Sequence, residues 1–166
     1  MDGKDRVRIM SNTNDDFLIE QNQDVANNFM ALLSDFNYSD EMELLEISKL
    51  NLILRKNLSK EFETLYIALW YSCLKTSFPQ NYDAIFQVFL ENNLTQKYKG
   101  AKLQEIKNRI QLYIELLGNT ASTDLTPITH HLLSFLNFDE ATQPAIKMKI
   151  TLHLRKVYTY IFERLI

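Results

Sequence analysis

The sequence contains little glycine, proline or cysteine, and each shortage limits what the chain can be. Three Gly and three Pro in 166 residues are too few for a fold rich in tight turns, which favours helices. The single cysteine, Cys73, cannot form an intramolecular disulfide, so we expect a reducing compartment and a cytoplasmic location. No stretch approaches the roughly 18 apolar residues that a membrane-spanning helix requires, so we expect no membrane partner.

The first residues also lack the apolar run that follows the basic residues of a signal peptide. Residues 1–20 show no helical periodicity, and we expect them to form a flexible N-terminal tail. Met10 competes with Met1 as the start of the chain. The remainder, residues 21–166, is long enough to bury a core and is expected to form one domain.

Acidic and basic residues are unevenly distributed along the chain. Residues 1–46 hold eleven acidic and three basic residues, whereas residues 47–166 hold ten acidic and fifteen basic residues. Two interpretations follow: the halves attract each other or are simply solvated, or the basic part binds an acidic partner. The formal net charge of -3 makes nucleic acid an unlikely partner.

Apolar residues recur at helical spacing in seven segments, and no segment alternates as a strand does. The sequence therefore predicts an all-α fold, a compact bundle of about seven helices. Two of them, 41–56 and 59–77, carry apolar residues around most of their circumference and are expected to be central. Ser59 is the expected N-cap of the second. The predicted helices span 21–36, 41–56, 59–77, 81–93, 96–117, 127–136 and 144–166.

The stretch LYIALWYSCLKTSFP, residues 65–79, contains the only Trp and the only Cys. Cys73 shares a helix face with large apolar residues and has no neighbouring base, so we expect a buried, unreactive thiol. The aromatic residues nearby are expected to belong to the core. The alternative is a pocket between the third and fourth helices, lined by Tyr66, Trp70, Tyr82 and Phe86.

Motifs for metal, cofactor or catalysis are missing or incomplete. His130 and His131 are adjacent and diverge on a helix, and His153 lies on an apolar helix face. Residues 35–46 place oxygen-bearing side chains at the spacing of a calcium loop, but Asp40 occupies the position that requires glycine. No glycine-rich phosphate loop and no acid/base pair can be nominated. We therefore predict no metal, no cofactor and no enzymatic activity.

The last predicted helix has apolar residues on two sides. Its second side holds Met148, Leu152 and Phe162 together with Arg155, and we predict a partner surface there. It is expected to be covered either by the short helix at 127–136 or by the same helix of a second copy in a homodimer. The function predicted from the sequence is a non-enzymatic protein-interaction or adaptor domain; the alternative is a small-molecule-binding regulatory domain.

Overall fold

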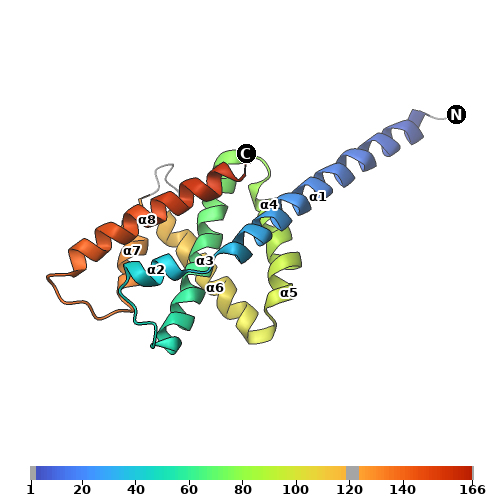
Figure 1. The fold of residues 1–166 in the computed structure, drawn as a ribbon. Coiled ribbons are helices and arrows are strands. Elements are labelled where there is room, and N and C mark those ends of the chain that lie inside the picture. The colour runs from blue at the N-terminus through green and yellow to red at the C-terminus, as the bar shows by residue number, and fades with distance from the viewer. Residues whose placement is uncertain (1–2, 119–123, 166) are drawn as a thin grey trace.

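The computed structural model describes the backbone of residues 3–118 and 124–165, and the side chains of those residues from Phe17 onward. Within these ranges every regular element is helical and none is a strand, which confirms the all-α prediction. In chain order the elements are α1 (Gly3–Asp35), α2 (Ser39–Leu44), α3 (Leu52–Ser77), α4 (Tyr82–Val88), the π-helical segment η1 (Phe89–Leu94), α5 (Thr95–Lys97), α6 (Gly100–Leu117), α7 (Thr126–Leu133) and α8 (Gln143–Glu163) (Figure 1).

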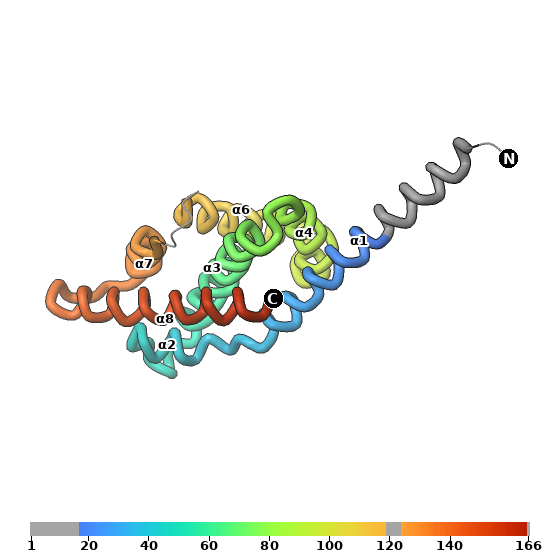
Figure 2. Tube along the Cα trace, turned by 90° about the horizontal axis from the view of Figure 1, so that it is seen from above, coloured from blue at the N-terminus to red at the C-terminus, as the bar shows by residue number. Residues whose placement is uncertain are grey.

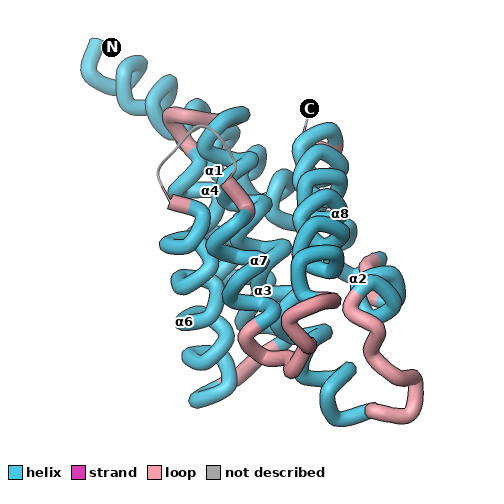
Figure 3. The backbone as a smooth tube through the Cα atoms, turned by 90° about the vertical axis from the view of Figure 1, so that its left-hand side faces the viewer, coloured by secondary structure: helices cyan, strands magenta, loops and turns pink. Residues whose placement is uncertain are grey.

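Helix α3 forms the centre of the bundle. It contacts α6, α8, α4 and α1, and every residue from 61 to 70 is buried. A helix in this position needs apolar or hydrogen-bonded side chains around its whole circumference, and this segment supplies both. Cys73 has no exposed surface, which confirms that it belongs to the core. Figure 3 shows α6, α7 and α8 arranged around α3.

The predicted central helix over 41–56 is wrong. Residues 45–51 lie outside any helix, and Glu46 adopts a left-handed backbone with φ 56°. The amide of Leu54 donates to the side chain of Asn51, which therefore caps the start of α3. Ser59 is not a cap, because it lies inside α3 and its hydroxyl donates to the carbonyl of Arg55. The apolar residues of this segment were expected to be buried. Met42 and Leu45 are, but Leu50, Leu52 and Ile53 are 91%, 72% and 79% exposed.

Helix α1 begins at Gly3, not near residue 21. The segment before residue 21 has no apolar stripe, which is why periodicity does not find it. However, residues 4–35 contain neither glycine nor proline, so no residue in this run stops a helix that is already formed. The division of the chain into a tail and one domain stays a prediction.

Most predicted helix ends are confirmed. The helix before Pro79 ends at Ser77, because the residue that precedes a proline is pushed out of the helical region. Gly118 follows α6 with φ 67°, a backbone region that favours glycine. Pro127 and Pro144 each lie in the first turn of a helix, where the missing N–H costs no hydrogen bond.

The ends of α1 and α8 extend in opposite directions. The C-terminal end of α8 lies beside α1, where Ile161 and Leu165 face Phe29 and Leu32 across a cleft. From this point the N-terminal end of α8 extends to one side of the molecule, and α1 from Val25 back to Phe17 extends to the other (Figures 1 and 2). Among the residues that the structure describes, no helix combines the length and hydropathy needed to cross a membrane.

Candidate functional site

The four residues of the predicted aromatic pocket lie in two separate clusters. Tyr66 packs against Phe36 at 4.8 Å between ring centroids, on the side of α3 that faces α2 and the end of α1. Trp70 and Phe86 form a second cluster at 6.1 Å, and Tyr82 joins it through Tyr71. A shared pocket would need all four side chains around one space. The structure instead places Trp70 in the floor of a different cleft.

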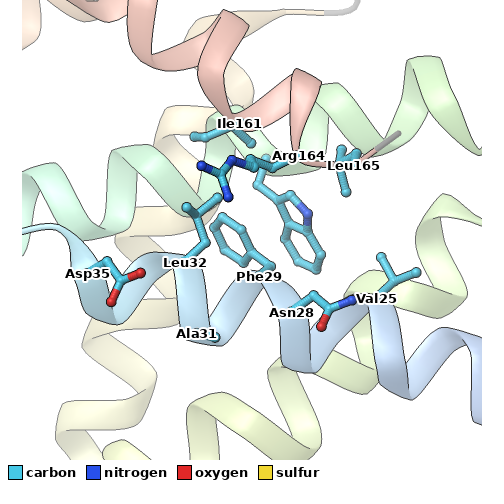
Figure 4. A pocket seen from close by; sticks show the side chains of 10 residues that line it. Val25, Asn28, Phe29, Ala31, Leu32, Asp35, Ile161, Arg164 and Leu165 are labelled. Atoms are coloured by element: carbon cyan, nitrogen blue, oxygen red, sulfur yellow. The ribbon is translucent and has the colours of Figure 1, made fainter.

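This cleft lies between α1 and the C-terminal end of α8 and has a volume of about 330 Å³ (Figure 4). Its floor includes Phe29 and Trp70, whose rings stack at 4.1 Å with an interplanar angle of 2°. The buried Nε1–H of Trp70 has no hydrogen-bond partner. A buried donor without an acceptor is uncommon, because leaving it unpaired costs about 1–3 kcal/mol.

The rim of the cleft is charged on both sides. Asp35 is at the end of α1, and Arg164 follows α8 with its guanidinium carbon 5.1 Å from the ring centre of Tyr160. Arg164 forms no ion pair with any described residue. The cleft therefore combines an apolar floor with one accessible cation, whereas the unpaired Nε1–H of Trp70 is buried.

Three buried glutamates form polar contacts that the sequence did not reveal. Each accepts a hydrogen bond from a tyrosine hydroxyl and another from a basic side chain, and each is 7% exposed or less. The sets are Glu41 with Tyr66 and His153, Glu61 with Tyr113 and Arg109, and Glu63 with Tyr98 and Lys97. They join α2, α5 and α6 to α3, and α2 to α8. The signal available in the sequence was two acidic residues inside an otherwise apolar run, EFETLYIALW, at 61–70.

Glu41 shows the electrostatics of such a set. Burial alone would raise the pKa of its carboxyl group, but hydrogen bonds from His153 and Tyr66 more than offset burial and leave the pKa below its ordinary value. The Nε2 atom of His153 lies 2.8 Å from Oε1 of Glu41. These groups bind one another between packed helices, so they fasten the fold. The Glu41 side chain faces the core here, although it occupies a ligand position in the calcium-like pattern of residues 35–46.

The other histidines lie apart from this set. His130 Nε2 is 2.6 Å from Nζ of Lys147, and the His131 ring packs edge-on against Tyr113 and Phe135. Burial lowers the pKa of His131. Within the described part of the chain no group of three His, Cys, Asp or Glu side chains could hold a metal ion.

The predicted partner surface on α8 is divided. Met148 and Leu152 are 62% and 50% exposed, and Arg155 is exposed on the same side of the helix. Phe162 is half-buried: it packs against the core and stacks on Tyr158. The short helix α7, one of the two expected covers, leaves Met148 and Leu152 exposed. It contacts α8 through Lys147 and Thr151 and buries Leu133 in the core.

We define the α8 face by five residues that lie within about one quarter of the helix circumference: Met148, Leu152, Arg155, Lys156 and Thr159. Four of these five residues, all except Met148, line a shallow depression together with Tyr160 and Glu163. Neither Arg155 nor Lys156 forms an ion pair with a described residue. The face is thus apolar, basic and open.

By fold this is an all-α helical bundle whose candidate sites are one cleft and one open helix face. No family model, curated protein or solved structure matches the chain.

Proposed function

We propose that this chain is a non-enzymatic, cytoplasmic protein-interaction domain whose α8 face binds an acidic amphipathic helix. The proposal is carried by one observation, the exposure of Met148 and Leu152 beside the unpaired cations Arg155 and Lys156. The cytoplasmic assignment is supported by the single, buried thiol of Cys73.

The chemistry of the face determines the partner that fits it. A partner helix that covers Met148 and Leu152 needs apolar residues at helical spacing, because burying these two side chains against apolar surface provides the free energy of binding. Acidic residues beside them would meet Arg155 and Lys156 and would raise the association rate at low salt. Nucleic acid fits less well, because Glu163 lies in the same depression and the chain is acidic.

The test uses two synthetic helical peptides with the same apolar stripe, one with glutamates and one with lysines on the flanking positions. Fluorescence anisotropy should show that the glutamate peptide binds and that salt weakens binding. Leu152→Glu should abolish binding, because it puts a carboxylate at the centre of the face. Ile53→Glu is the control on another surface, at a residue that is 79% exposed against 50% for Leu152, and it should bind normally. Equal binding of both peptides, or no effect of Leu152→Glu, would exclude this function.

A second candidate function is favoured by the apolar floor of the cleft and the cation at its rim. A small apolar carboxylate would pair with Arg164 and lie against the apolar floor, in a cavity of about 330 Å³ that is near the lower limit for small-molecule sites. Trp70 is the only tryptophan, so its fluorescence reports directly on the cleft. Titration with decanoate should change that fluorescence, and Arg164→Gln should weaken the response while Arg155→Gln leaves it unchanged. A response equal in all three proteins would reject the site.

A further inference from the structure

The acidic half of the chain contains a segment with the chemistry that the α8 face requires. We call residues 17–24 of α1 the α1 arm. Phe17 is 65% exposed, and Glu20 and Asp24 are exposed at three and seven residues further along the helix. At that spacing the three side chains lie on one side of α1. The arm therefore presents an aromatic ring next to two carboxylates.

The charges of the two surfaces are complementary; Arg155 interacts electrostatically with Asp124 but forms no salt bridge with it. Neither Glu20 nor Asp24 forms an ion pair with a described residue, and the same is true of Arg155 and Lys156. The apolar parts are complementary as well, since Phe17 on the arm and Leu152 on the α8 face are both exposed to water. A contact between the surfaces would bury both and pair the charges.

Within one molecule the arm cannot reach the α8 face. Phe17 lies about 18 Å along α1 from Phe29, and Leu152 lies about 14 Å along α8 from Ile161, at a rise of 1.5 Å per residue. Phe29 and Ile161 line the same cleft, and the two helices leave that cleft in opposite directions (Figures 1 and 2). The complementary surfaces therefore lie at opposite ends of the molecule.

We propose that the α1 arm of one copy binds the α8 face of a second copy. Because the two surfaces lie at opposite ends, two molecules side by side and antiparallel place each arm on the partner's α8 face. This arrangement closes with two-fold symmetry and leaves neither surface open. The inference rests on the proposed function, since it names the helix that the α8 face binds.

A symmetric contact between two α8 helices is the alternative dimer. It would bring Arg155 and Lys156 close to their own copies, and like charges in such a contact oppose association. It would also leave Phe17 in water. The arm contact avoids both costs, which is why we favour it.

The experiment exchanges the charges of the two surfaces and measures mass by light scattering at high micromolar concentration. The unmutated chain should be a dimer. The arm variant Glu20→Lys/Asp24→Lys and the face variant Arg155→Glu/Lys156→Glu should each raise the dissociation constant roughly tenfold or more, because each brings like charges together. Mixing the two variants should restore a dimer that contains one copy of each, since both of its contacts then join opposite charges.

The control for net charge is Lys49→Glu/Lys56→Glu. It changes the charge by the same amount as the face variant, but Lys49 lies in the loop before α3 and Lys56 in the first turns of α3. It should remain a dimer. If the arm variant also remains a dimer, the contact does not use the arm and the inference is wrong. If the unmutated chain is monomeric, the homotypic contact is absent, whereas binding of the glutamate peptide to the α8 face would still uphold the proposed function.

Discussion

Residues 50–54 and 65–69 are two stretches of similar composition in opposite environments. Both are rich in leucine and isoleucine, LNLIL in the first and LYIAL in the second. In the second stretch no side chain has exposed surface, whereas Leu50, Leu52 and Ile53 are the three most exposed large apolar residues among those described. The two stretches are only ten residues apart, and residues 52–54 and 65–69 belong to the same helix, α3.

The difference lies in what surrounds each stretch. Residues 65–69 lie where α3 is enclosed by its neighbouring helices, whereas residues 50–54 follow a loop at the N-terminal end of α3. The carboxylates next to the buried stretch, Glu61 and Glu63, are bonded to side chains from α6 and α5 and the residue that follows α5. Apolar composition therefore permits burial, but the neighbouring helices decide it.

The largest difference between the stretches should be the reactivity of a thiol. Burial raises the pKa of Cys73 to about 12, and its Sγ is enclosed in the core. In the native protein it should react with a bulky disulfide reagent at neutral pH at least about a thousandfold more slowly than a free thiol, since reaction requires unfolding. Leu52→Cys adds a second thiol in the exposed stretch that should react at the rate of a free thiol. Rapid labelling of Cys73 in the unmutated chain would contradict its assignment to the core.

The second prediction compares truncations. Leu65→Ala should lower the free energy of unfolding by about 2–5 kcal/mol, because it removes buried methyl groups and leaves a cavity among enclosed side chains. Urea unfolding followed by the fluorescence of Trp70 measures the change. Ile67→Val is a milder control at a residue equally buried, with an expected loss of about 0.5–1.5 kcal/mol. A loss below that of the control would mean that the core is looser than its burial indicates.

The third prediction concerns the polar contacts that enclose α3. The folded-state pKa of Glu41 lies below its ordinary value of 4.5, so the carboxylate stabilises the fold above about pH 4.5. This contribution should be lost as the pH falls through the folded-state pKa. Glu41→Gln should lower stability at neutral pH by about 1–3 kcal/mol, because it removes a charged acceptor from His153 and Tyr66.

Acid titration of stability separates this effect from a packing defect. The unmutated chain should lose more stability than Glu41→Gln between neutral pH and pH 3, because glutamine cannot take up the proton. Glu43→Gln, on the exposed side of α2, should change stability at neutral pH by no more than about 0.5 kcal/mol. Parallel pH profiles for the unmutated chain and Glu41→Gln would show that the carboxylate does not contribute through its charge.

The same comparison explains which features could be predicted from the sequence. Periodicity and the residues Pro79, Gly118, Pro127 and Pro144 predict most helices and their ends, because these signals are local. The loop at 45–51 was missed, because its apolar residues continue the helical pattern although Leu45 is buried and Leu50 is exposed. The roles of Glu41, Glu61 and Glu63 depend on partners up to 112 residues away, so no local pattern contains them.

The smallest expected effect is in the exposed stretch. Leu52→Ala removes the same atoms as Leu65→Ala, but from a side chain that is 72% exposed, so stability should change by no more than about 0.5 kcal/mol. Ile53→Ala should behave alike, since it is exposed to a similar degree and lies in the first turn of α3. Both changes are measured by urea unfolding at low protein concentration, where association does not contribute. A loss above about 1 kcal/mol in either variant would show that this stretch is buried in solution. Both stretches would then be buried, and they would differ only in which part of a protein covers them.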